Sequence, residues 1–128
     1  MQRTIPILHI DSYEEAKAFY VDWLGFAIDW EFRFEPGLPV YMQLSREGLL
    51  LHLSEHKGDN PGGVLCHVDV DDLDALMREW RQKRPDFAQE AVVMPWNAKH
   101  IDLKDPFGNT LGINQILPED VGRRSHPL

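Results

Sequence analysis

The sequence repeats itself at an offset of 60 residues, and this repeat constrains the fold more than any other feature. The segment Ile10–Tyr13 aligns with Val70–Leu73, and Glu47-Gly48 before one apolar run aligns with Phe107-Gly108 before another. Solenoids need three or more short units, so two long copies indicate one supersecondary module that occurs twice. We therefore expect equivalent positions of the two copies to face one shared ligand site.

The first copy predicts a strand, a helix and three further strands. Ser12 with Glu15 three residues later is a capping box, and Gly25 is a natural helix end. Large apolar residues alternate with smaller or charged ones from Phe26 to Phe34, which is the pattern of a strand. The five predicted elements are the strand 4–10, the helix 12–24, and the strands 26–34, 40–46 and 49–54.

The second copy follows a turn-rich linker, residues 57–63, and predicts the same order of elements. A strand at 64–70 precedes a helix capped by Asp71 or Asp72, and strands follow at 90–94, 100–104 and 110–115. We predict one α+β domain over residues 1–128, with βαβββ modules at 4–56 and 64–115 and a tail at 116–128. The modules are expected to form a curved mixed sheet with the helices outside and a concave ligand cleft inside.

Charge and composition exclude several classes of function. The formal net charge of −8 argues against a nucleic-acid partner, because phosphate binding needs clustered lysine and arginine. No apolar run approaches the ~20 residues of a membrane-spanning helix. The start of the chain lacks the features of a signal peptide, and the one cysteine, Cys66, has no partner for an internal disulfide. We predict a cytosolic protein that binds neither nucleic acid nor membrane.

Aromatic side chains are the main functional signal. An aromatic-lined cleft binds flat or cationic ligands through stacking and ring electrostatics. Asp29 and Glu31, predicted to share one face of their strand, either meet a cationic ligand or are simply solvated. For Trp30 and Phe32, packing in the core is the alternative to lining a cleft. The predicted ligand-binding residues are Trp30, Phe32, Phe34, Tyr41, His52 and Trp96.

Three motifs together resemble the vicinal oxygen chelate superfamily, which includes glyoxalase I, extradiol dioxygenases and bleomycin resistance proteins. They are Phe19-Tyr20 before Leu24-Gly25-Phe26, the helix start Val70–Ala75, and Asp105–Asn109 before the last strand. The resemblance covers about residues 4–115 and is strongest to the small bleomycin-resistance-like proteins. It implies a homodimer with ligand sites in large clefts, often at the subunit boundary.

Catalytic members of this superfamily hold a divalent metal on the concave face. The resemblance places the ligand positions at Ile5, His52, Leu65 and Gly112, of which only His52 can bind a metal. A catalytic divalent site normally needs about three protein ligands. We therefore expect no metal and no cofactor, with His52 the only retained candidate ligand and no catalytic residue predicted.

The sequence leaves three functions open. The first, which we favour, is a non-catalytic protein of the bleomycin-resistance type that sequesters a cationic aromatic antibiotic or a similar ligand. The second is a metal-dependent glyoxalase-like lyase, isomerase or dioxygenase whose rearranged site would use His52 with some of His56, His67 or His100. The third is a binding module that senses a metabolite or joins another protein.

Overall fold

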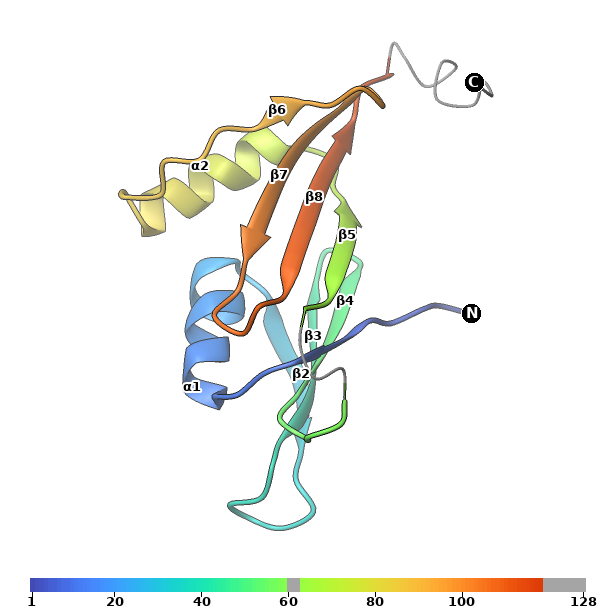
Figure 1. Cartoon of the computed structure of the whole chain (residues 1–128), viewed down its shortest axis with the longest axis vertical. Helices are drawn as coiled ribbons and strands as arrows, with labels where there is room; N and C mark the ends of the chain where they lie inside the picture. The colour runs from blue at the N-terminus through green and yellow to red at the C-terminus, as the bar shows by residue number, and fades with distance from the viewer. Residues whose placement is uncertain (60–62, 119–128) are drawn as a thin grey trace. The chain divides into compact units, whose positions relative to one another are not determined.

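The structure, a computed structural model, describes residues 1–59 and 63–118 and divides them into two compact units (Figure 1). The first unit comprises Met1–Cys66 and Lys104–Thr110, and the second comprises His67–Leu103 and the described residues from Leu111. The elements are β1 (Ile7–His9), α1 (Tyr13–Ala16), η1 (Lys17–Trp23), β2 (Ala27–Phe32), β3 (Tyr41–Arg46), β4 (Leu49–Ser54), β5 (Leu65–Asp69), α2 (Leu73–Lys83), β6 (Val92–Val93), β7 (Ala98–Lys104) and β8 (Thr110–Ile116).

The strands of each copy form a four-stranded sheet, in the order β1-β4-β3-β2 in one copy and β5-β8-β7-β6 in the other. In the first sheet β1 runs parallel to β4, and β3 pairs antiparallel with both β4 and β2. The predicted α+β class and the two βαβββ modules are thereby confirmed, although each module has its own sheet where the sequence predicted a single curved one. The predicted tail, 116–128, starts one residue too early, because Ile116 still belongs to β8, and its residues from 119 lie outside the described chain.

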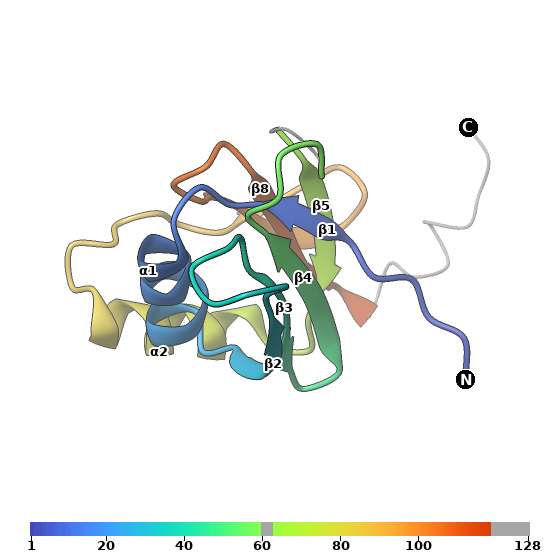
Figure 2. The same cartoon turned by 90° about the horizontal axis from the view of Figure 1, so that it is seen from below.

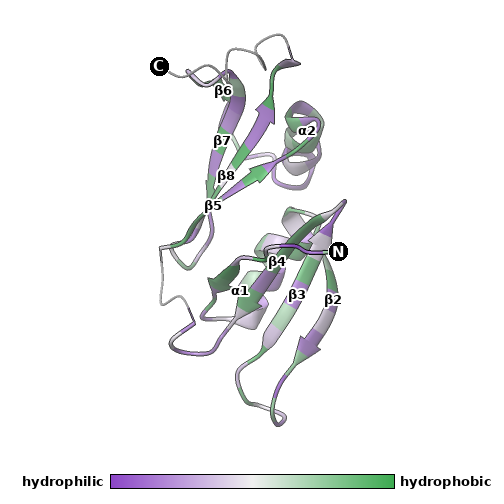
Figure 3. Cartoon of the chain, turned by 90° about the vertical axis from the view of Figure 1, so that its right-hand side faces the viewer, coloured by the Kyte–Doolittle hydropathy of each residue, from purple (hydrophilic) through white to green (hydrophobic). Residues whose placement is uncertain are grey.

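The first sheet covers its core with one face only. Hydropathy alternates along its strands, as Figure 3 shows for β3 and β4. The buried positions are Leu8 on β1, Met42 and Leu44 on β3, and Leu51 and Leu53 on β4, all at most 2% exposed. The helical segment of α1 lies to one side of this sheet (Figure 2). The opposite face of the sheet remains available for other roles.

Both helices begin as the sequence predicts. The Ser12 hydroxyl accepts a hydrogen bond from the Glu15 amide at 3.2 Å, and the Asp72 carboxylate accepts one from the Ala75 amide at 3.0 Å. These caps lie 60 residues apart, so the repeat holds in the structure. After α1 the chain continues as the wider π-type helix η1, which the apolar spacing does not predict, and Gly25 leaves the helix at a φ of 86°.

A buried polar network stabilises the turn between β7 and β8. The Tyr20 hydroxyl donates to Asp105 Oδ2 at 2.6 Å, and Asp105 Oδ1 accepts from the Phe107 and Asn109 amides, both at 2.8 Å. The Asn109 side chain donates to the backbone oxygen of His9 at 2.9 Å. Burial, and secondarily the Asp105 carboxylate, raises the pKa of Tyr20 far above its ordinary value, so this phenol stays protonated as a donor. The predicted turn motif therefore connects this turn by hydrogen bonds to Tyr20 and to His9 within the first unit.

The second unit departs from the prediction at β6. The predicted strand of five residues is only Val92–Val93, and both side chains are more than half exposed. The repeat does hold at two turn glycines. Gly48 and Gly108, 60 residues apart, have φ angles of 89° and 87°. No helix within the described part of the chain has the length and apolar character needed to cross a membrane.

Candidate functional site

Three rings lie together on the face of the first sheet that points away from its core. We call Trp30 on β2, Tyr41 on β3 and His52 on β4 the aromatic patch. Trp30 and Tyr41 are nearly parallel, with ring centroids 6.1 Å apart, and the His52 ring meets them edge-on at 5.4 and 5.1 Å. Trp30 is 42% exposed, so the alternative that it packs in the core is wrong. The patch presents an aromatic surface to solvent.

A bulge in β2 places a carboxylate beside this patch. The register of β2 against β3 shifts between Ile28 and Trp30, which leaves Asp29 as the extra residue. Such a bulge locally breaks the alternation of the two faces. Asp29 accepts hydrogen bonds from the side chains of Gln43 at 3.0 Å and Ser45 at 2.8 Å.

Glu31 lies on the other side of the same strand. It is paired with Met42, which is fully buried, and its carboxylate accepts a hydrogen bond from the Tyr13 hydroxyl of α1 at 3.1 Å. The prediction that Asp29 and Glu31 share a face is therefore wrong, because the bulge shifts the alternation between them. Of these two carboxylates, Asp29 is the one that lies with the polar side chains of the outer face.

A chain of hydrogen bonds connects the patch to Asp29. Because Gln43 Nε2 donates to Asp29, Gln43 Oε1 is the atom that faces His52 Nε2, 3.0 Å away. His52 Nε2 must then carry the hydrogen, which leaves Nδ1 to accept from the Tyr41 hydroxyl at 2.7 Å. The side chains of Tyr41, His52 and Gln43 are thus held in one orientation by bonds that end on a carboxylate.

The electrostatics of the patch favour a neutral imidazole and an ionised carboxylate. Burial, followed by the positive charge of Arg3, lowers the pKa of His52 below its ordinary value. Hydrogen bonds from Gln43 and then Ser45 lower the pKa of Asp29. Burial, with a smaller contribution from Asp59, raises the pKa of the Tyr41 phenol, so it remains a donor. The fixed charges that act on the patch are the negative carboxylates of Asp29 and Asp59 and the positive guanidinium of Arg3.

Two further predicted residues, Phe32 and Phe34, form an exposed pair next to the patch. Phe32 is the strand partner of Tyr41 and is 49% exposed, so core packing is wrong for it as well. Phe34 lies beyond the end of β2, is 73% exposed, and has its ring 5.0 Å from Phe32. The Phe34 ring also lies 6.1 Å from His56, which does not belong to β4. The first unit thus brings five of the six predicted ligand-binding residues to its surface.

The sixth predicted residue, Trp96, belongs to the second unit. It is 41% exposed, and its ring lies 6.0 Å from that of His100. His100 is buried between Asn114 Oδ1 at 2.7 Å and Asp102 Oδ1 at 2.9 Å. Ligand binding by the six residues remains a prediction. Sequence reasoning missed Gln43 and Ser45, although they follow Tyr41 by two and four residues, which places them on the same face of the strand.

Gly112 on β8 makes room for two imidazole rings. A Cβ atom at this position would lie 2.8 Å from His67 Cδ2 and 3.2 Å from His100 Cε1. The His67 and His100 rings therefore meet 6.0 Å apart over a position that carries no side chain. This packing explains why the residue that repeats His52 at the 60-residue offset is glycine.

We expect Gly112→Ala to lower the free energy of unfolding by about 1–2 kcal/mol, because the new methyl overpacks against His67 and the fixed His100. Denaturant unfolding would measure the loss in the native chain and in a His67→Ala background. The loss should be clearly smaller in the His67→Ala background, because the nearer clash is absent there. Equal losses in both backgrounds would show that the imidazole contact is not the cause.

The positions that the superfamily resemblance implies for a metal do not fit one. Ile5, Leu65 and Gly112 carry no donor atom, and both ring nitrogens of His52 are engaged by Tyr41 and Gln43. In β1 the residue paired with His52 is Ile7, which also has no donor. Within residues 1–59 and 63–118, no three or more His, Cys, Asp or Glu side chains gather in a way that could hold a metal ion.

Comparison with solved structures identifies similar proteins. A bleomycin-binding protein solved in complex with bleomycin is 25% identical over 91% of this chain and 100% of its own, with a TM-score of 0.69. A bleomycin resistance determinant encoded on transposon Tn5 is 26% identical over 91% of this chain and 98% of its own, with a TM-score of 0.72. TnmS3, an antibiotic-binding protein from Streptomyces sp. CB03234, is 23% identical over 91% and 97%, with a TM-score of 0.70.

Sequence comparison gives the family directly. A search of curated protein sequences found no match. A family model described as glyoxalase superfamily protein matches residues 1–119, which is nearly the whole chain. This match agrees with the resemblance carried by the three sequence motifs. The chain belongs to the glyoxalase superfamily.

Proposed function

We propose that this protein binds a small molecule with a flat, cationic group and withholds it from its target without transforming it, as a protein of the bleomycin-resistance type. The observation that carries the proposal is the exposed aromatic patch with the ionised Asp29 at the end of its hydrogen-bond chain. In this proposal the protein acts as a cytosolic homodimer and needs no cofactor.

The chemistry of the patch matches such a ligand. The face of a tryptophan ring attracts cations and stacks on flat groups, and Trp30 already stacks on Tyr41 in this way. The carboxylate of Asp29 supplies a negative charge, and the net charge of −8 attracts cations at longer range. Because Tyr41, His52 and Gln43 hold one another, little side-chain freedom is lost on binding.

The comparisons support the same class of ligand. Two of the similar structures are named for binding bleomycin or resisting it, and a third is named for binding an antibiotic. Their identity to this chain is 23–26%, so the ligand of this protein has to be tested directly.

The test is isothermal titration of the purified chain with metal-free and copper-loaded bleomycin, and with an aldehyde–glutathione adduct as the comparison. We expect saturable binding of the drug at about one site per chain and no heat from the adduct. Absence of binding by both forms of the drug would refute the bleomycin assignment. Binding and turnover of the adduct would instead favour the enzymatic function.

We expect ligand affinity to fall as the pH decreases. His52 is neutral above its lowered pKa, which lies under the ordinary value of about 6.5. Below that pKa the ring gains a positive charge, Nδ1 can no longer accept from Tyr41, and a cation is repelled. The affinity should therefore be constant above about pH 6.5 and should decline below it.

Titration of N-methylacridinium, whose charge does not depend on pH, would measure this effect. The His52→Gln variant should remove most of the pH dependence while it retains binding at neutral pH. An unchanged pH profile in that variant would show that another group is responsible.

A further inference from the structure

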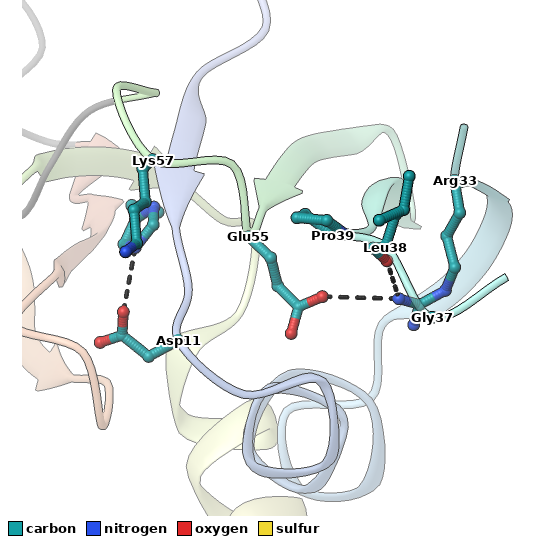
Figure 4. A pocket seen from close by; sticks show the side chains of 8 residues that line it. Asp11, Arg33, Gly37, Leu38, Pro39, Glu55 and Lys57 are labelled. Atoms are coloured by element: carbon teal, nitrogen blue, oxygen red, sulfur yellow. Dashed lines mark hydrogen bonds and ion pairs between the residues drawn. The ribbon is translucent and has the colours of Figure 1, made fainter. Parts of the chain in front are cut away.

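A pocket in the first unit, away from any role assigned above, opens where β1 and β4 end (Figure 4). Its volume of about 370 Å³ lies within the range of small-molecule sites. The loop Gly37–Pro39 forms one wall, and the other lining residues are five titratable side chains: His9, Asp11, Arg33, Glu55 and Lys57. The aromatic patch contributes no residue to this lining.

The loop wall is held in place by Arg33 and Glu55. Glu55 Oε1 accepts a hydrogen bond from the Val40 amide at 2.9 Å and lies 3.6 Å from Arg33 Nη1. The same Arg33 nitrogen donates to the Leu38 carbonyl, and Figure 4 shows the guanidinium between Leu38 and Glu55. Pro36 and Gly37 occupy the central positions of the turn closed by the Leu38 amide and the Glu35 carbonyl at 3.0 Å. The pocket is therefore preformed on this side.

Several polar atoms of the pocket have no partner among the described residues. Glu55 is only 21% exposed, and its Oε2 atom makes no hydrogen bond. Lys57 is exposed and forms no ion pair within the described chain. His9 Nε2 meets Asp11 Oδ1 at 3.0 Å, whereas His9 Nδ1 is buried and unpartnered. Of these atoms His9 Nδ1 is buried, which is uncommon for an unpaired polar atom, whereas the side chains of Glu55 and Lys57 are accessible to a ligand in the pocket.

The charges of the pocket indicate what would satisfy these atoms. Asp11 and Glu55 supply two negative charges, and Arg33 and Lys57 supply two positive charges, so the permanent charges cancel. Such a pocket offers no net attraction to a simple anion or cation. It suits a ligand with no net charge that carries one positive and one negative group. The ammonium group of such a ligand would meet a carboxylate of the pocket, and its carboxylate would meet the lysine.

We propose that this pocket binds a small zwitterion of the amino-acid class. The ligand's ammonium group donates to Glu55 Oε2, and its carboxylate pairs with Lys57 Nζ. Glu55 and Lys57 are two residues apart just after β4, so both ends of a short ligand can be met. The exposed side chain of Leu38, with Pro39, offers apolar contact to the ligand's side group. His9 acts as a positioning residue for Asp11 at the rim.

The test is a ¹⁵N NMR titration of the full chain with single compounds. The probes are glycine, serine, leucine and phenylalanine, together with ethylamine, acetate and glycine betaine, each of which lacks one of the two required groups. We expect at least one amino acid to shift the amides of residues 9–11, 37–38 and 55–57 in a saturable way. The single-ended compounds and betaine should bind about tenfold more weakly or not at all, since each loses one charged hydrogen bond.

Two variants locate the site. Glu55→Gln keeps an acceptor for the Val40 amide and Lys57→Met keeps the length of the side chain, so both should fold. Each should weaken amino-acid binding about tenfold or more, whereas Lys104→Met, at an exposed lysine outside the pocket, should not. Lack of saturable shifts with every amino acid, equal binding of acetate or ethylamine, or undiminished binding in both variants would each overturn the proposal. Bleomycin titration is independent of these results.

Discussion

Replacement of Asp105 by alanine is expected to lower the free energy of unfolding by at least about 3 kcal/mol. The change removes the acceptor for four donors: the Tyr20 hydroxyl, the amides of Phe107 and Asn109, and the Asn109 side-chain nitrogen. Tyr20 is fully buried, and Asn109 and Asp105 are nearly so, which means that water cannot readily replace the lost bonds. Urea unfolding followed by circular dichroism would measure the loss.

The matched control is Asp86→Ala, at an exposed aspartate of the second unit, which should change the unfolding free energy by less than about 0.5 kcal/mol. Tyr20→Phe provides a graded comparison, since it removes only the bond at 2.6 Å and should cost about 1.5–3 kcal/mol. Similar stability of the Asp105→Ala and Asp86→Ala variants would mean that the network contributes little to the fold.

Replacement of Trp30 by alanine is expected to weaken bleomycin binding about 30-fold, which corresponds to about 2 kcal/mol. The indole supplies the broad stacking face of the aromatic patch, and neither Tyr41 nor His52 can replace it from its own position. Isothermal titration would measure the loss. Trp30→Phe should recover part of the affinity, since a smaller ring still stacks.

Stability separates this effect from misfolding. Because 42% of Trp30 is exposed, Trp30→Ala should change the melting temperature only slightly. Val93→Ala, at an exposed apolar side chain of the second unit, is the binding control and should leave the affinity unchanged. A Trp30→Ala variant that binds the drug as tightly as the native chain would remove the aromatic patch from the proposed function. Trp96→Ala tests in the same way whether the sixth predicted residue contacts the ligand.

Much of the fold could be predicted because it follows local rules. The caps at Ser12 and Asp72, the turn at Gly48 and the turn before β8 depend on side chains that bond to backbone a few residues away. Such signals can be recognised from a short segment of sequence without knowledge of the rest of the fold. Their common offset of 60 residues then predicted the two modules, and the resemblance of three motifs indicated the family.

The candidate site was predicted only in part. The alternation from Phe26 to Phe34 predicted a strand with two faces but not which face the core covers, so core packing of Trp30 and Phe32 stayed open. The bulge at Asp29 depends on pairing with β3 and leaves no signal in β2 alone. For this reason the sequence placed Asp29 on one face with Glu31, whereas in the structure Asp29 accepts hydrogen bonds from Gln43 and Ser45.

The amino-acid sequence by itself determined the repeated module, its strand and helix order, and the set of aromatic residues from which a ligand surface is built. Tertiary structure decided which of these rings meet, that Asp29 lies beside them, and that His9 and Glu55, 46 positions apart in sequence, line one pocket. The physical reason is that pairing of distant strands sets register, bulges and the ends of strands, and these contacts depend on both partners at once.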